Sequence, residues 1–299
     1  MARFTVIPEV SAVTGINPIP TTRPVTERRP EQRLTRRQAW QHDGVTDVLP
    51  LTEFDDDPVD VITSAVDHSL LSLPPRGVLT LLGATTPTWA ADHGFTTVAQ
   101  IPTITMDFPV WVGQHRGVDV ALLEVPLGAP AATIVADHVF RHGIRAAVAV
   151  GSCGGLVHFD EGEFVVPTRA LRDEGTSFHY RPPSRWIELD EDMVHACTSA
   201  IDDAGFAHAT ASTWTTDAFF RETRSKIDAR QQEGCTVVDM ECSALAACAR
   251  FRGARYGQIL FTADTLASEV HDVRDWGRAS HSTALRLALD AVTRAPLPS

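Results

Sequence analysis

The sequence lacks the features that would place the protein at a membrane or outside the cell. No uninterrupted apolar run reaches the roughly 20 residues that a membrane-spanning helix needs, so no membrane partner is expected. The opening residues, MARFTVIPEV, do not show the basic and then apolar pattern of a secretory signal. We therefore expect a cytoplasmic protein.

Cysteine and histidine are not arranged as they are in metal sites. There is no HExxH motif and no paired CxxC motif, so neither a metal nor another cofactor is expected. The cysteines are odd in number, which favours free thiols in a reducing compartment over a disulfide framework. They are Cys153, Cys197, Cys235, Cys242 and Cys248.

Positive charge is in short supply. The chain has 26 Lys and Arg against 38 Asp and Glu, which gives a formal net charge of -12. Nucleic-acid partners are attracted mainly by fields of Lys and Arg, so a general nucleic-acid binder is excluded. A small substrate that is gripped locally fits this composition better.

Residues 1–47 show no sustained helical or strand period and are rich in Pro and Arg, as in TTRPVTERRPEQRLTRRQAW. They are interpreted as an N-terminal extension, which is either a surface tail or an arm that reaches a neighbouring subunit. Residues 48–299 contain no fixed-period repeat and no low-complexity block, and they are predicted to form one domain.

In this second region, segments typical of strands alternate with segments typical of helices. The alternation predicts an α/β fold, a three-layer αβα sandwich with a central mixed sheet. The predicted strands include RGVLTLLG, VDVALLEVP, AAVAVG, EFVVP, ATASTWTT, CTVVDM and YGQILFTAD. The predicted helices include VDVITSAVDHSLL, AATIVADHVFRHG, 191–204, SALAACARF and STALRLALDAVTRA.

A glycine-rich turn, VGSCGG, follows the strand AAVAVG and contains Gly151 and Ser152. It lacks the Lys of a P-loop and the spacing of a dinucleotide fingerprint. Two interpretations remain open for this turn. It is a tight connection, or it is a cradle in which backbone amides and the Ser152 hydroxyl approach an anion or a sugar oxygen.

Three acids follow predicted buried strands. In VVDMECSAL, Asp239 and Glu241 lie on the same side of an extended chain, with Met240 on the other side. Such a carboxylate either accepts two hydrogen bonds from a vicinal diol or favours the N-terminus of the helix that follows. Asp264 ends the strand QILFTAD. Active-site groups of α/β folds gather at strand ends, so the three acids indicate an active site.

Two loops add further candidates. RDEGTSFHY, residues 172–180, holds His179, which is either part of a polar loop or a general base or ligand. TTDAFF holds Phe219 and Phe220, and on the residues alone these two aromatic side chains are predicted to lie in the core rather than to stack on a planar base.

Together, VVDMECSAL, VGSCGGL, RDEGTSFHY and TTDAFF resemble motifs of the nucleoside phosphorylase superfamily, which includes uridine phosphorylases, purine nucleoside phosphorylases and nucleosidases. The resemblance implies cleavage of the N-glycosidic bond of a nucleoside by inorganic phosphate, which yields ribose 1-phosphate and a free base. It also implies a homo-oligomer, a trimer or a hexamer.

The resemblance further implies a role for each matching residue. Asp264 protonates the departing base, so it should be partly desolvated. Glu241, Met240, Phe219, Ser152, Gly151 and His179 contact the nucleoside, with Glu241 on the sugar hydroxyls. Gly83 and Ser152 contact phosphate.

The sequence departs from this family where phosphate would bind. Two arginines of the phosphorolytic relatives are replaced, one by Ala149 and the other by a residue of LGATTPTW, which contains no Arg. Arg141, Arg145 or an arginine of the N-terminal extension would have to substitute for them. A phosphate-independent nucleosidase and a catalytically inactive nucleoside-binding protein therefore remain as alternatives. The identity of the base stays open.

Overall fold

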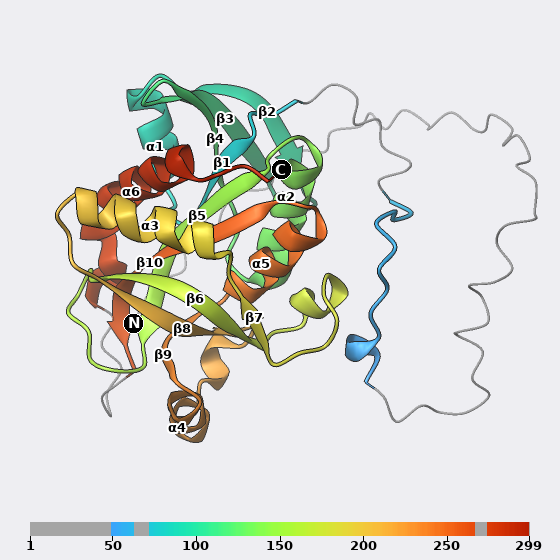
Figure 1. Cartoon of the computed structure of the whole chain (residues 1–299), viewed down its shortest axis with the longest axis vertical. Coiled ribbons are helices and arrows are strands. Elements are labelled where there is room, and N and C mark those ends of the chain that lie inside the picture. The colour runs from blue at the N-terminus through green and yellow to red at the C-terminus, as the bar shows by residue number, and fades with distance from the viewer. Residues whose placement is uncertain (1–48, 63–71, 267–273, 299) are drawn as a thin grey trace, which may run out of the picture. The chain divides into compact units, whose positions relative to one another are not determined.

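The computed structural model describes residues 49–62, 72–266 and 274–298, all of which belong to one compact unit, Val48–Ser299 (Figure 1). Its strands are β1 (Arg76–Thr80), β2 (Thr96–Pro102), β3 (Asp107–His115), β4 (Val118–Glu124), β5 (Ala146–Gly155), β6 (Phe164–Asp173), β7 (Trp186–Glu188), β8 (His208–Thr216), β9 (Cys235–Asp239) and β10 (Arg255–Thr265). Its α-helices are α1 (Thr85–Asp92), α2 (Ala129–Arg141), α3 (Glu191–Asp203), α4 (Arg224–Gln232), α5 (Cys242–Phe251) and α6 (His281–Arg294). Its 3-10 helices are η2 (Pro50–Thr52), η4 (Thr176–His179), η5 (Phe219–Arg221) and η6 (Arg274–Ser280).

The strands form one ten-stranded mixed sheet in the order β10-β6-β8-β9-β5-β1-β4-β3-β2, with β7 added to β6. Strand β10 also pairs with β5, so β5, β9, β8, β6 and β10 form a closed ring. Strands β1, β4, β5 and β10 run parallel in this sheet. Their carboxyl ends therefore meet at one edge, which is where an α/β fold collects its functional groups.

Helices cover both faces of the sheet, which makes the three layers visible in Figure 1. On one face, α1, α3 and α6 pack against inward side chains such as Val78 and Val148. On the other face, α2 and α5 pack against Leu79 and Ala147. Neighbouring residues of one strand thus enter different cores, because successive side chains of a strand point to opposite faces. The central strands β1 and β5 are therefore buried over most of their length on both faces.

The predicted three-layer α/β fold with a mixed sheet is confirmed. The sequence pattern did not predict the β2–β3 antiparallel pair, α1, β7 or α4. The helix predicted in VDVITSAVDHSLL lies mostly outside the described residues, and the described part of that segment, 59–62, is not helical. Within the described ranges, no helix combines the length and apolarity that crossing a bilayer requires.

Close packing of α3 on β10 depends on the absence of a side chain at Gly257. A Cβ atom there would lie 3.0 Å from Met193 Cβ and 3.2 Å from Cys197 Sγ. We predict that Gly257→Val lowers the free energy of unfolding by roughly 1 to 3 kcal/mol, because overpacking a filled core costs this much. Urea denaturation followed by circular dichroism measures the change. Ala207→Val on an exposed loop residue is the control, and equal stability of the two variants would contradict the packing argument.

Candidate functional site

The junction of β9 and α5 explains the two acids of VVDMECSAL, Asp239 and Glu241. Strand β9 ends at Asp239, and Glu241 is the N-cap residue of α5. Asp239 Oδ2 accepts hydrogen bonds from the backbone N–H groups of Glu241 (3.1 Å) and Cys242 (2.7 Å). Asp239 therefore satisfies the helix N-terminus, the role that the sequence had suggested for Glu241.

Glu241 is left to face a different partner. Its side chain is buried, and its Oε1 accepts a hydrogen bond from the backbone N–H of Gly128 at 2.6 Å. Gly128 precedes α2 in the loop after β4, so this bond links the ends of β9 and β4. Burial, and then the negative charge of Asp239, raise the pKa of Glu241 to about 8, although the Gly128 N–H opposes the rise.

Asp264 lies near the end of β10, beside a bulge. Thr262 pairs with Cys153 and Asp264 with Gly154, so Ala263 is an extra residue that redirects the strand. Only 6% of Asp264 is exposed, which agrees with the expectation of a partly desolvated acid. A Cβ atom at Gly154 would lie 3.3 Å from Asp264 Oδ1 and 2.9 Å from Val238 Cγ1. The glycine therefore lets the carboxylate and β9 approach β5 closely.

The end of β5 lies between these acids. Gly154 pairs with Val238 of β9 on one side and with Asp264 of β10 on the other. Burial raises the pKa of the Cys153 thiol well above its ordinary value, and the negative charges of Asp239 and Asp264 raise it further. Both acids thus act on the same thiol. Ser152 is exposed although Gly151 and Cys153 on either side are buried, so its hydroxyl is accessible at this edge.

Gly83 and Glu124 extend the edge towards β1 and β4. Gly83 follows β1 in an exposed turn, where its φ of 54° is in the left-handed region that favours glycine. Glu124 is the last residue of β4 and pairs with Thr80 of β1. Burial raises the pKa of the Glu124 carboxyl, while the backbone N–H of Gly83 facing it opposes the rise. The amide assigned to phosphate in the sequence analysis therefore already faces a carboxylate.

Some sequence candidates lie elsewhere. His179, at the end of η4, lines a cavity of about 950 Å³ whose lining includes Asp137, Arg141 and Tyr180 but not Glu241, Asp264 or Ser152. Met240 is partly exposed and follows β9 directly. Phe219 and Phe220 in η5 are 36% and 93% exposed, and their rings meet edge to face, so the prediction that they belong to the core is wrong.

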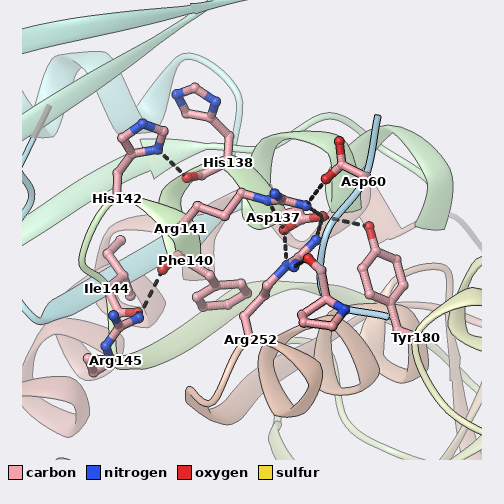
Figure 2. Close-up of polar contacts among 11 residues, drawn as sticks. Asp60, Asp137, His138, Phe140, Arg141, His142, Ile144, Arg145, Tyr180 and Arg252 are labelled. Atoms are coloured by element: carbon pink, nitrogen blue, oxygen red, sulfur yellow. Dashed lines mark hydrogen bonds and ion pairs between the residues drawn. The ribbon is translucent and has the colours of Figure 1, made fainter. Parts of the chain in front are cut away.

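Figure 2 shows how the arginines near this cavity are held. Arg141 Nε and Arg252 Nε both donate to Asp137 Oδ1, at 3.0 and 2.6 Å, and Arg141 also donates to Asp60. Tyr180 donates its hydroxyl to Asp137. Figure 2 also shows Arg145, which donates to the backbone carbonyl of Phe140. Arg141 and Arg145, which were considered as substitutes for the missing phosphate ligands, thus donate hydrogen bonds to other groups of the fold. The N-terminal extension, which holds the other candidates, lies outside the described residues.

Several residues of this edge were missed in the sequence analysis. Glu124 ends the parallel strand β4 and Gly128 follows it, so both could have been predicted as site residues from their position at a strand end. Glu174 accepts hydrogen bonds from Ser243 Oγ (2.7 Å) and from the backbone N–H of Ser177 (2.9 Å). No local pattern predicts that contact, since Glu174 and Ser243 are distant in sequence. Among the described residues, no group of His, Cys, Asp and Glu side chains could hold a metal ion.

Ionisation of Glu241 should make the folded protein less stable at alkaline pH. Because the folded-state pKa is about 8 and the ordinary value is 4.5, the stabilisation is complete below about pH 4.5 and is lost as pH rises through 8. We predict that wild type loses roughly 2 to 3 kcal/mol relative to Glu241→Gln between pH 6 and pH 9. Gln keeps an acceptor for the Gly128 N–H but cannot ionise.

Chemical denaturation of both proteins at the two pH values measures this difference. Glu188→Gln, a change at an exposed residue of β7, is the matched control and should leave the difference between pH 6 and pH 9 as in wild type. A Glu241→Gln variant that gains nothing over wild type at pH 9 would show that Glu241 ionises normally.

The chain is similar to known proteins in sequence and in fold. The family model of the phosphorylase superfamily matches residues 77–293. A guanosine phosphorylase of Halorubrum lacusprofundi is 25% identical over 62% of this chain and 81% of its own length. A uridine phosphorylase of Escherichia coli is 20% identical over 63% of this chain and 80% of its own length.

Among solved structures, an AMP nucleosidase from Bacteroides thetaiotaomicron matches with a TM-score of 0.60 and 22% identity, covering 74% of this chain and 88% of that one. This likeness concerns the fold. The family model, by contrast, matches most of the chain and spans every strand end described above. The chain belongs to the phosphorylase superfamily.

Proposed function

We propose that the protein is an enzyme that cleaves the N-glycosidic bond of a nucleoside. The observation that carries this proposal is the convergence of acids from β9 and β10 on the end of β5. Asp264 lies close to Gly154, and the negative charges of Asp239 and Asp264 both raise the pKa of the Cys153 thiol. Glu241 follows Asp239 after one residue. The substrate class follows from the family, whose named relatives include guanosine and uridine phosphorylases.

Two charges develop when a C1'–N bond breaks, and each has a partner in this proposal. The sugar becomes oxocarbenium-like and positive, while the departing base becomes negative. Asp264 donates a proton to the base, a role that suits a buried carboxyl group. Glu241 accepts hydrogen bonds from the sugar hydroxyls, Met240 packs against the sugar and the exposed ring of Phe219 contacts the base.

The group that accepts the sugar has two candidates. Phosphate is the acceptor implied by the named phosphorylases, with the Ser152 hydroxyl and the Gly83 amide as contacts. Water is the second candidate, and one observation favours it. Glu124 already presents a carboxylate to the Gly83 N–H, and a second anion there would meet like charge. In the hydrolytic version, Glu124 accepts a proton from the attacking water.

We also propose that the protein acts in the cytoplasm as a homo-oligomer, a trimer or a hexamer, in keeping with the family. Every residue assigned to the proposed site comes from the one chain that the structure describes. The base is left open, so purine and pyrimidine nucleosides belong together in the first substrate panel.

Removing the proposed general acid should abolish most of the activity. Asp264→Asn keeps the shape of the side chain but cannot donate the proton, so kcat is expected to fall about 100- to 10,000-fold. Release of free base, followed by chromatography, measures kcat and KM. Asp228→Asn on the exposed face of α4 is the control. If Asp264→Asn turns over nucleosides as fast as wild type, the assignment of the acid is wrong.

The acceptor is identified by assaying nucleosides with and without phosphate. If water is the acceptor, free ribose forms at the same rate in both conditions, and Glu124→Gln slows its release by roughly 100-fold or more. If phosphate is the acceptor, ribose 1-phosphate forms only when phosphate is present. A wild-type protein that binds nucleosides but releases no base under either condition would be an inactive binding protein.

A further inference from the structure

Asp239 is the most completely bonded acid of the site, although the proposed reaction gives it no contact with substrate. Its carboxylate accepts four hydrogen bonds. Oδ1 accepts from the hydroxyls of Thr213 (3.0 Å) and Thr215 (2.8 Å) of β8, and Oδ2 accepts from the backbone N–H groups of Glu241 and Cys242. Only 4% of the residue is exposed. With its oxygen atoms occupied in this way, Asp239 cannot also grip a sugar.

These bonds continue beyond β9. Thr215 Oγ1 also accepts a hydrogen bond from the backbone N–H of Ser243 at 3.1 Å, and Ser243 Oγ donates to Glu174 at 2.7 Å. Glu174 in turn accepts from the backbone N–H of Ser177 in η4. A buried chain of hydrogen bonds thus joins the loop of RDEGTSFHY to the first turn of α5. Buried networks in which every group is bonded hold a single geometry.

We propose that Asp239 is a positioning residue for Glu241: it fixes the backbone at the start of α5 and places a negative charge behind the sugar-binding carboxylate when it is ionised. This inference rests on the proposed function, because it assigns Glu241 to the sugar. Asp239 holds the backbone on one side of the Glu241 side chain, and the Gly128 N–H donates a hydrogen bond to its carboxylate on the other.

Among the described residues, Asp239 is the charged side chain whose negative charge raises the pKa of Glu241. Glu241 also faces the Cys242 thiol of α5 and the Tyr256 hydroxyl of β10, and the backbone N–H groups of Gly128 and Met240 oppose the rise of its pKa. Burial raises the pKa of both Cys242 and Tyr256 well above their ordinary values, so both are uncharged near neutral pH. Burial raises the pKa of Asp239, and the four hydrogen bonds that its carboxylate accepts oppose this rise by favouring the ionised form.

A sugar diol donates hydrogen bonds, so it binds best to ionised Glu241. The negative charge behind Glu241 delays that ionisation and couples sugar binding to release of a proton. The protein therefore binds nucleosides more tightly as pH rises towards 8, and Asp239 sets the midpoint of this dependence. An acid that merely held the strand in place would leave that midpoint unchanged.

Asp239→Asn is the appropriate test, because asparagine keeps the shape and removes the charge. Its amide oxygen can accept the two backbone N–H groups, and its NH2 group can donate to the threonine hydroxyls, which rotate to accept. The midpoint of the pH dependence of kcat/KM is expected to move down by about one unit, since a neighbouring like charge shifts a carboxyl pKa on this scale. Asp228→Asn is the control for removing a carboxylate elsewhere.

A measurement without substrate separates this inference from the proposed function. The free energies of unfolding of Asp239→Asn and of the double variant Asp239→Asn/Glu241→Gln are measured at pH 6 and pH 9. Between these pH values, the difference between the two variants should change less than the difference between wild type and Glu241→Gln. If this happens but no nucleoside is cleaved, the positioning role stands and the proposed function fails. If the kcat/KM midpoint and the pH-dependent stability difference both stay at their wild-type values, the positioning role is wrong whatever the enzyme cleaves.

Thr215→Val provides a second variant, which keeps Asp239 and removes one of its anchors. It is expected to raise KM severalfold with little change in kcat, because Glu241 is held less well for binding the sugar. Thr236→Val is the matched control, because Thr236 lies on the face of β9 opposite to Asp239. Equal KM values for the two valine variants would overturn the anchoring part of the proposal.

Discussion

The arrangement of the site depends on one buried carboxylate that satisfies a helix N-terminus. An α-helix begins with backbone N–H groups that have no partner within the helix. At the start of α5 this need falls in the core, where water cannot meet it, and Asp239 meets it from the preceding strand. Because Asp239 takes this structural duty, Glu241 two residues later is free to face the edge of the sheet. The cost of burying two acids so close together is expressed in the raised pKa of Glu241.

The fold contributes by bringing distant segments to the same edge. Strands β1, β4, β5 and β10 are parallel, so the turns that follow them collect Gly83, Gly128 and the residues around Gly154 and Asp264. Glycines at this edge allow main chain and carboxylates to approach each other closely. Near η4, another carboxylate is bonded on several sides: Asp137 forms ion pairs with Arg141 and Arg252 and accepts a hydrogen bond from the Tyr180 hydroxyl.

The sequence was sufficient to predict the three-layer fold, since runs such as AAVAVG and ILF are apolar on both faces and alternate with segments of helical period. It was less informative for β2 and β3, where exposed and buried positions are mixed because β2 lies at the edge of the sheet. For the site, the acids after β9 and β10 could be found from their place at strand ends. Their division of labour could not, because it depends on hydroxyl groups of Thr213 and Thr215 in another strand. The contact of Glu124 with the amide of Gly83 is equally non-local.

The closed ring of β5, β9, β8, β6 and β10 has a consequence for how this protein can diverge. In an open sheet, an edge strand can slide by two residues and disturb only the one ladder that it shares with its single neighbour. In a closed ring, sliding one strand breaks ladders on both sides, so insertions and deletions inside the ring are strongly disfavoured. The register of the strands within the ring is therefore tightly constrained. New chemistry has to arise in the connecting loops, and the bulge at Ala263 is the one place within the described part of β10 where the ladder with β5 has already absorbed an additional residue.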